Sequence, residues 1–383
     1  MRLSVSRSLP FALTATLFLA ASRPGQTPAK LEQELDAQFL EATSGGSPGL
    51  AVLVKKDGKV LLKKGYGVRE LRRKVRISAD TDFRLASCTK QFTAMAAMLL
   101  VADGKLDYQE NLTEILPAFP AYGRAITVRH LLNHTSGLPD YEDLMERAEK
   151  QQGKTWSPER QIRDDEVLAL LEKETRGKFA PGSRWEYSNS GYVLLGLIVK
   201  ERSGKPFARF LRERIFAPLG MEGTLVFEKG QNEVPRRAYG HSKIDNRFVE
   251  TDQSPTSATQ GDGGVYSNLE DLSKWDDALR DHTLLGEKEF APALAPAALP
   301  PGAEAKLAED APASMRGRPV AYGFGWFLDL QGPEPVAWHY GDTMGFKSAI
   351  VRGLGDGVSV IVLSNRTDMD PQSVAMRVAG EIR

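Results

Sequence analysis

The sequence of 383 residues has little of three features that would narrow its class. Cysteine occurs once, at Cys88, so no disulfide can form within the chain. That cysteine and five scattered histidines do not supply the usual Cys/His ligands of a structural zinc site. Lys+Arg and Asp+Glu both number 50, so the chain has no net charge to attract nucleic acid or an anionic membrane. We therefore expect no metal, no cofactor and no nucleic-acid partner, and any ligand must be recognised at a local site.

Long apolar runs are also missing, except near the N-terminus. Arg2 and Arg7 give the first residues of the chain a positive charge, and a run of 13 mostly apolar residues follows from Leu9 to Ala21. A membrane-spanning helix takes roughly 20 apolar residues, whereas this pattern is typical of a secretory signal peptide. We expect residues 1–22 to be that signal, with a membrane anchor as the alternative and no stable insertion after cleavage. Export without disulfides suits a periplasmic or secreted protein of the bacterial envelope, where Cys88 must be buried to escape oxidation.

Strand-like segments gather at the two ends of the chain. A helical stripe from Leu31 to Ala42 precedes two apolar segments that Asp57-Gly58 joins, and this dipeptide is a strong hairpin signal. Near the C-terminus, further strand-like segments are followed by a helix that Asp370-Pro371 opens. The expected strands cover Leu50 to Val54, Val60 to Leu62, Val320 to Leu328, Val336 to Tyr340, Phe346 to Val351 and Val358 to Leu363. Because they are apolar on both faces, both faces of their sheet should be covered.

The middle of the chain has the period of helices. Apolar stripes at helical spacing recur from Ser87 to about Arg280. They include Phe92 to Leu100, Val128 to Leu132, Val167 to Leu171, Tyr192 to Val199 and Phe207 to Ile215. The fold class predicted is α/β (α+β): an antiparallel sheet built from both chain ends and flanked by helices, with a mainly helical insertion. The expected boundaries are 29–86 with 320–383 for the sheet domain, 87–285 for the helical domain and 286–319 for an Ala/Pro-rich surface excursion.

A serine and a lysine stand where the first sheet segment gives way to the helical region. Ser87 is expected to open an Ala- and Met-rich helix, and Lys90 lies three residues on, so both side chains share one helix face. A serine at a helix start is ordinarily an N-cap, and Ser-x-x-Lys is expected about once by chance in a chain of this length. The pair alone is therefore weak evidence for a nucleophile and its base.

Two further motifs follow in order. Tyr187-Ser188-Asn189 precedes the helix at Tyr192 and would, in isolation, be a capping turn. His339-Tyr340-Gly341 ends an apolar strand at the expected edge of the sheet, where a histidine is ordinarily a satisfied strand-end residue. Each motif is weak, and their order and placement carry more information than any of them alone.

Together these motifs resemble the serine β-lactamase and penicillin-binding protein superfamily, in which Ser-x-x-Lys, Tyr-x-Asn and then Lys-Thr-Gly or His-x-Gly occur in this order. The resemblance covers nearly the whole mature chain. Three further stretches are similar to class C β-lactamase relatives: Leu131 to Pro139, Pro218 to Met221 and Gly263 to Ser267. His339 stands where class C β-lactamases have lysine, which looks more like the D-alanyl-D-alanine carboxypeptidase, D-aminopeptidase and esterase-like branch.

The resemblance implies a set of roles. Ser87 would be the nucleophile, with Lys90 or Tyr187 as the first base, and the choice between them stays open. Asn189 would bind the substrate carbonyl and help to fix Lys90. The backbone N–H groups of Ser87 and of Asp342, just after Gly341, would form the oxyanion hole. His339 would orient substrate or assist proton transfer near neutral pH.

The chemistry sets a condition on Lys90. A serine hydroxyl needs a base within hydrogen-bond reach, but a lysine with a pKa of about 10.4 is neutral in roughly one molecule in 2,500 at pH 7. Lowering that pKa by about three units corresponds to roughly 4 kcal/mol. We expect burial beneath an apolar helix, with carbonyl groups around the amine, to provide it.

Other patterns in the sequence are weaker. Gly45 to Gly49 matches Gly-x-Ser-x-Gly, but this stretch precedes a strand and opens no helix. His130 and His134 have the spacing of two metal ligands on a helix, yet Leu131 stands where the general-base glutamate of zincins would be. We interpret both histidines as packing residues.

The sequence therefore predicts an exported serine hydrolase that acts through an acyl-enzyme on a small ester or a D-amino-acid amide or peptide. Two alternatives remain: a penicillin-binding or sensor module that acylates without turnover, and a class C-type β-lactamase. The expected partner is a small ester, peptide or β-lactam substrate, and the sequence predicts no oligomeric state.

Overall fold

The structure is a computed structural model that describes residues 27–303, 305–306, 321–330 and 334–383. The predicted signal peptide, residues 1–22, lies outside these ranges, and so do Gly332 and Pro333, a dipeptide that predicts a turn between two of the expected strands. Within them, no helix combines the length and the apolar character that crossing a membrane requires.

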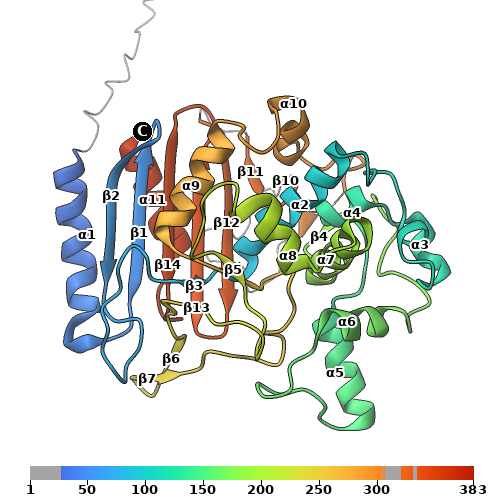
Figure 1. The fold of residues 1–383 in the computed structure, drawn as a ribbon, viewed down its shortest axis with the longest axis horizontal. Helices are drawn as coiled ribbons and strands as arrows, with labels where there is room; N and C mark the ends of the chain where they lie inside the picture. The colour runs from blue at the N-terminus through green and yellow to red at the C-terminus, as the bar shows by residue number, and fades with distance from the viewer. Residues whose placement is uncertain (1–26, 304, 307–320, 331–333) are drawn as a thin grey trace, which may run out of the picture.

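A seven-stranded antiparallel sheet forms the centre of the molecule, and both ends of the chain build it (Figure 1). Its strands are β1 (Leu50–Lys56), β2 (Lys59–Tyr66), β10 (Ala321–Tyr322), β11 (Phe327–Asp329), β12 (Val336–Thr343), β13 (Phe346–Gly353) and β14 (Val358–Ser364). They lie in the order β10-β11-β12-β13-β14-β1-β2. The predicted hairpin joins β1 to β2, and Asp57 and Gly58 have the positive φ values, 49° and 74°, that a tight hairpin turn demands.

Both faces of the sheet are buried, as the apolar strands predicted. Helices α1 (Pro28–Ala42) and α11 (Pro371–Ile382) cover one face, and α2 (Lys90–Ala102) and α9 (Leu269–Arg280) pack on the other side (Figure 1). Consecutive residues of β14 point to opposite faces of the sheet. Val360 packs in the cluster under α1 and α11, whereas Ile361 packs in the cluster that contains α2. All seven residues of β14 are buried.

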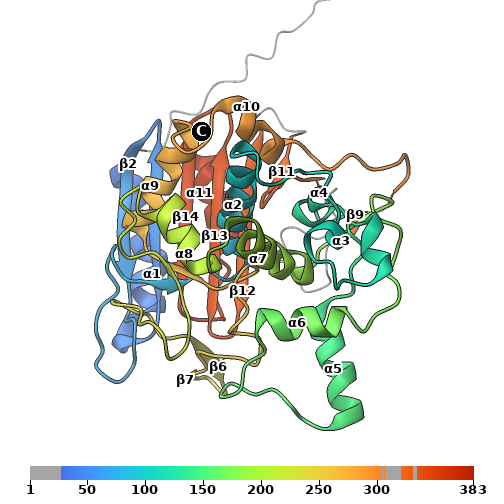
Figure 2. The ribbon, with the colours of Figure 1, turned by 45° about the vertical axis from the view of Figure 1, so that its right-hand side comes forward.

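The helical region lies beside the sheet (Figure 2). Its remaining helices are α3 (Leu112–Ile115), α4 (Val128–Leu132), α5 (Tyr141–Gln152), α6 (Asp164–Leu171), α7 (Asn189–Ser203), α8 (Phe207–Leu211) and α10 (Glu287–Phe290). The short strands outside the main sheet are β3 (Phe83–Arg84), β4 (Trp185–Glu186), β5 (Leu225–Val226), β6 (His241–Ile244), β7 (Arg247–Glu250), β8 (Val265–Ser267) and β9 (Ala305–Lys306). Every predicted helical stripe falls on a helix. The short strands within this region were not predicted, because two to four residues are too few to show a period of two.

The expected single strand from Val320 to Leu328 is wrong. The chain instead forms two short strands, β10 and β11, in which Tyr322 pairs with Phe327. Gly325 makes the turn between them with a φ of 78°, and a Cβ at this position would lie 2.8 Å from the carbonyl oxygen of Lys90. Only glycine fits a turn of this shape packed so closely on α2. The aromatic residues of this stretch therefore lie on a hairpin and not on one face of a single strand.

The described part of the Ala/Pro-rich stretch 286–319 is anchored to the rest of the molecule. The stretch begins with α10 and a 3-10 turn, in which Ala293 is fully buried and its carbonyl accepts a hydrogen bond from Phe324 N at 3.1 Å. Farther on, β9 pairs in parallel with β4, which lies just before Tyr187. The described part of the stretch thus contacts the segment that carries the second motif.

Candidate active site

Ser87 lies in a 3-10 turn, Ala86–Thr89, that leads directly into α2. Ala86, just before it, has a φ of 49°, a strained conformation for a residue with a side chain, costing about 1–3 kcal/mol. The Ser87 side chain caps no helix. Its Oγ instead accepts a hydrogen bond from Lys90 Nζ at 3.1 Å. The ordinary explanation of a serine at a helix start therefore does not apply to Ser87.

Lys90 is fully buried, and its amine sits among three oxygen acceptors. Besides Ser87 Oγ, Nζ donates to Asn189 Oδ1 and to the Asp262 carbonyl, both at 2.9 Å. Burial lowers the pKa of Lys90 to about 8, although the negative charges of Asp262 and Asp140 act in the opposite direction. At that pKa about one molecule in ten is neutral at pH 7. Burial therefore lowers the pKa of Lys90 in the direction that the proposed chemistry requires, by somewhat less than the shift set out above.

Two tyrosine rings lie under the Lys90 amine, and their hydroxyls have different partners. Nζ is 4.9 Å from the ring centre of Tyr187 and 5.5 Å from that of Tyr192. The Tyr187 phenol interacts with the Ser87 hydroxyl, and burial raises its pKa well above the ordinary value of 10. The Tyr192 phenol instead donates to the Leu132 carbonyl at 2.7 Å. Of the two phenol groups, only that of Tyr187 interacts with the Ser87 hydroxyl.

The sheet brings the third motif to the same place, but not as expected. β12 is the third strand from one side of the sheet, so His339 does not lie on an edge strand. However, β11 pairs only with residues 336–338 of β12. The rest of that side of β12, from His339 to Thr343, passes the 3-10 turn that carries Ser87. Cys88 Sγ donates to the His339 carbonyl at 3.5 Å across this contact.

His339 is buried and both of its ring nitrogens are occupied. Nδ1 donates to the Tyr340 carbonyl at 2.7 Å, so Nε2 accepts the hydrogen bond from the Tyr322 hydroxyl at 3.0 Å. Burial, reinforced by the charge of Lys90, lowers the pKa of His339 to about 3. A ring that is neutral near pH 7 fits the first of the two roles that the resemblance implied for this histidine, orienting substrate, better than it fits proton transfer.

Gly341 and Asp342 follow on the same strand. A Cβ at Gly341 would lie 2.1 Å from the Leu85 carbonyl oxygen and 2.4 Å from Ser348 Oγ. Only glycine lets β12 approach the segment before Ser87 so closely. The Asp342 carboxylate faces outward, half exposed, with Lys347 Nζ at 3.4 Å, so its side chain does not point into the serine cluster. What the structure brings to Ser87 at this position is the main chain of β12.

His134 is a site residue that the sequence interpreted only as packing. It is fully buried, its ring centre lies 4.3 Å from that of Tyr187, and its Nδ1 accepts a hydrogen bond from Ser188 N at 3.1 Å. The helical i, i+4 relation to His130 is wrong, because α4 ends at Leu132 and His134 has a φ of 61°. The two histidines face different partners: His134 braces the Tyr187 ring, and His130 binds Thr127.

Two aspartates near the lysine were not predicted. The main chain of Asp262 holds Lys90, and its buried carboxylate accepts the Tyr141 hydroxyl at 3.2 Å. Asp140 Oδ2 accepts from Asn189 N at 3.4 Å, which ties the start of α7 to the start of α5. Both stand beside stretches that resembled the family, residues 131–139 and 263–267. Proximity to those stretches was the only signal in the sequence for either aspartate.

Cys88 is buried beside the serine, as expected, and we predict that it has no catalytic part. Burial raises the pKa of its thiol to about 12, so the thiol stays neutral and unreactive. Cys88→Ala should retain most of the hydrolytic activity, and a thiol reagent should label the wild type only after unfolding. Labelling of the folded protein with loss of activity would contradict this prediction.

Among the described residues, no group of three or more His, Cys, Asp and Glu side chains is arranged to hold a metal ion. What the cluster contains is a serine hydroxyl hydrogen-bonded to a buried amine.

A serine, a buried lysine and a tyrosine at the junction of an antiparallel sheet and a helical region define a serine hydrolase of the β-lactamase/transpeptidase-like superfamily. The chain belongs to the beta-lactamase family, whose pattern matches residues 29–381. It is 31% identical over 344 residues to penicillin-binding protein 4* of Bacillus subtilis, covering 86% of this chain and 71% of that protein.

Solved structures agree with this assignment. The octameric penicillin-binding protein homologue of Pyrococcus abyssi is 26% identical, with a TM-score of 0.75 over 91% of this chain and 75% of that one. The D-amino acid amidase of Ochrobactrum anthropi, complexed with L-phenylalanine amide, is 27% identical, with a TM-score of 0.72 over 92% of this chain and 97% of that one.

Proposed function

We propose that the protein is an exported hydrolase that forms an acyl-enzyme at Ser87 and acts on a small ester or, preferably, a D-amino-acid amide or peptide. The observation that carries the proposal is the hydrogen bond between Ser87 Oγ and the amine of Lys90, a lysine that burial makes partly neutral. The preference for an amide draws on the likeness to the D-amino acid amidase. Histidine in place of lysine in the third motif argues against a β-lactamase as the main activity. Export rests on the predicted signal at residues 1–22.

The reaction starts with Ser87 and Lys90. Ser87 Oγ attacks the substrate carbonyl carbon and its proton moves to the neutral amine of Lys90, so the carbonyl oxygen takes up the negative charge. Between Lys90 and Tyr187 we assign the first proton to Lys90. The reason is that burial lowers the pKa of an amine toward neutrality but raises that of a phenol further away from it.

Tyr187 serves the second half of acylation. When the tetrahedral intermediate collapses, the bond between carbonyl carbon and leaving group breaks, and an amine leaving group must receive a proton. The Tyr187 hydroxyl interacts with Ser87, and the Lys90 amine lies over the Tyr187 ring, so the hydroxyl relays the proton from the lysine to the leaving group. Water then attacks the ester at Ser87 and releases the acid, with the same groups acting in reverse.

The oxyanion is assigned to the backbone N–H groups of Ser87 and Asp342. Two facts support this assignment. Ser87 stands at the start of α2, where the helix dipole favours negative charge, and β12 is not covered by β11 beyond Trp338. Asn189 is then left to orient the substrate carbonyl while its Oδ1 holds Lys90.

Steady-state turnover tests the proposal. The wild type should hydrolyse p-nitrophenyl butyrate and D-phenylalaninamide over many cycles, and Ser87→Ala should be inactive on both. Benzylpenicillin, as a third substrate, distinguishes the two alternatives. A single stoichiometric burst with every substrate would mean a sensor that acylates without turnover, whereas rapid hydrolysis of penicillin alone would mean a β-lactamase. Activity that a chelator abolishes and Ser87→Ala retains would overturn the mechanism.

A further inference from the structure

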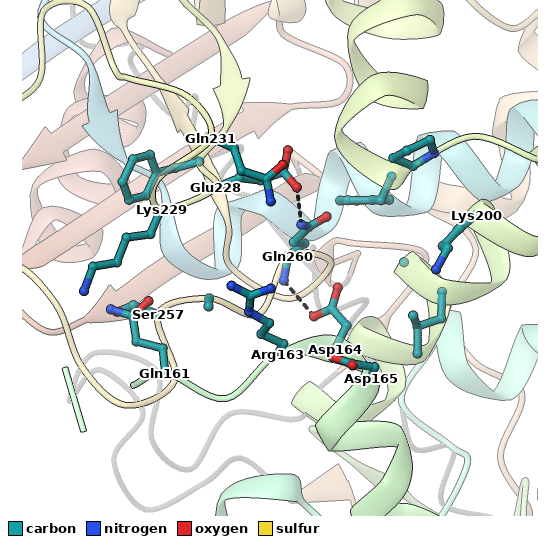
Figure 3. Close-up of a pocket in the computed structure, with 16 residues that line it drawn as sticks. Gln161, Arg163, Asp164, Asp165, Lys200, Glu228, Lys229, Gln231, Ser257 and Gln260 are labelled. Carbon is teal, nitrogen blue, oxygen red and sulfur yellow. Dashed lines mark hydrogen bonds between the residues drawn. The ribbon is translucent and has the colours of Figure 1, made fainter. Parts of the chain in front are cut away.

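A cavity lies in the helical region, apart from the serine cluster, and has no role in the mechanism above (Figure 3). It has a volume of about 340 Å³, at the lower end of the range for small-molecule sites. Its walls come from the starts of α6 and α8, the middle of α7, the segment after β5, and residues 257–260. Neither Ser87, Lys90, Tyr187 nor Asn189 lines it. A ligand here would therefore occupy a site of its own.

One side of the cavity carries two carboxyl groups that accept hydrogen bonds from the same glutamine. Asp164 Oδ1 accepts Gln260 N at 3.0 Å and Glu228 Oε1 accepts Gln260 Nε2 at 3.1 Å (Figure 3). Burial, with smaller contributions from nearby negative charges such as that of Asp262, raises the pKa of Asp164 to about 8, although the hydrogen bond from Gln260 acts in the opposite direction. A positively charged ligand group beside Asp164 would offset the free-energy cost of its buried negative charge. The carboxyl pair is thus suited to an ammonium group.

Positive side chains stand on the other sides. Figure 3 shows Arg163 and Lys200 to either side of Asp164. Both are exposed, and within the described ranges neither makes an ion pair. Arg163 and Lys200 are therefore free to receive a carboxylate.

Apolar surface completes the cavity. Leu197 and the buried Phe207 contribute from α7 and α8, and Phe227 contributes from the segment after β5. The cavity therefore combines carboxyl groups, unpaired cations and apolar walls. A simple anion would be repelled by the carboxyl groups, and a simple amine would leave Arg163 and Lys200 without a counter-ion.

We propose that this cavity binds a zwitterionic α-amino acid with an apolar side chain. Its ammonium group lies beside Asp164 and Glu228, and its carboxylate lies beside Lys200 and Arg163. The apolar side chain packs on Leu197 and Phe207. The proposal rests on the proposed function only for the source of the ligand, because a D-amino-acid amidase releases such an amino acid. Gln260, which lines the cavity, is close in sequence to the serine cluster, since it lies two residues before Asp262, whose carbonyl accepts a hydrogen bond from Lys90.

Calorimetric titration with D-phenylalanine tests the proposal. The wild type should bind it, and binding should weaken by about tenfold or more in Lys200→Glu and in Asp164→Asn, as expected when one partner of a charge pair is lost. The neighbouring Glu201→Gln, on the same helix but outside the cavity, should bind as the wild type does. Phenylpropionate, which lacks the ammonium group, and phenethylamine, which lacks the carboxylate, should both bind more weakly than the amino acid.

The controls separate this site from the serine cluster. Unchanged p-nitrophenyl butyrate hydrolysis and melting temperature in Lys200→Glu show that the variant is folded. If Tyr187→Ala abolishes D-phenylalanine binding and Lys200→Glu does not, the amino acid binds at the serine and the proposal fails. Absence of binding, or an analogue that binds as tightly as D-phenylalanine, would also overturn it. Binding by a protein without turnover would leave this site standing and reject the proposed function, and turnover without binding would do the reverse.

Discussion

Replacing Lys90 with alanine is expected to lower kcat/KM by about 10²–10⁴-fold on both an activated ester and an amide, the range for loss of a general base. The variant removes the amine that hydrogen-bonds Ser87 Oγ and leaves the hydroxyl without a proton acceptor. Lys55→Ala is a matched control, because Lys55 is also a buried lysine but pairs with Asp276 and Asp277. The control should lose stability and keep, per folded molecule, most of its activity.

The same lysine sets the pH dependence. Lys90 accepts a proton only when it is neutral, and its pKa in the folded protein is lowered to about 8. For the wild type, kcat/KM should therefore rise about tenfold per pH unit below that value and level off above it. Lys90→Ala should lose this dependence. A wild-type profile that is flat from pH 6 to 9, or a profile that Lys90→Ala leaves unchanged, would show that another group is the base.

Replacing Tyr187 with phenylalanine should have an effect that depends on the leaving group. With D-phenylalaninamide the amine must be protonated to leave, so kcat/KM should fall by about 10²–10³-fold. With a p-nitrophenyl ester the leaving group departs as a stable anion, and the loss should be about tenfold or less. Tyr192→Phe is the matched control, since its ring also lies under Lys90 but its hydroxyl binds Leu132.

The leaving-group comparison also distinguishes the two candidate bases. If Tyr187 took the first proton from Ser87, Tyr187→Phe would slow ester and amide hydrolysis equally. Comparable losses on the two substrates would therefore contradict the assignment of Lys90 as first base. A loss in Tyr192→Phe as large as that in Tyr187→Phe would show that the rings, and not the Tyr187 hydroxyl, matter to the reaction.

The long elements and the order of the motifs were predictable from the sequence. The hairpin at Asp57-Gly58 and the helix after Asp370 have local signals, a turn dipeptide and a capped apolar stripe, that need no tertiary contact. The contact between Lys90 and Asn189 joins residues 99 positions apart. Periodicity does not predict such a pairing, and it came from the resemblance to a known superfamily.

The errors arose where tertiary packing decides the local structure. The stretch from Val320 to Leu328 alternates like one strand, yet Gly325 turns the chain back because α2 lies against it. His339 was expected to titrate near neutral pH, but burial and the charge of Lys90 lower its pKa to about 3, although its hydrogen bond to the Tyr340 carbonyl acts in the opposite direction. The main-chain carbonyl of Asp262 was invisible to motif analysis because every residue has a carbonyl group, and only the fold brings this one to Lys90.

The measurement that tests the central claim most directly is the intact mass of the protein, acid-quenched during turnover of p-nitrophenyl butyrate. The account predicts a butyryl adduct that peptide mapping locates on Ser87, that disappears as substrate is exhausted, and that never forms on Ser87→Ala. Turnover without an adduct on Ser87, or an adduct on another residue that persists in Ser87→Ala, would contradict it.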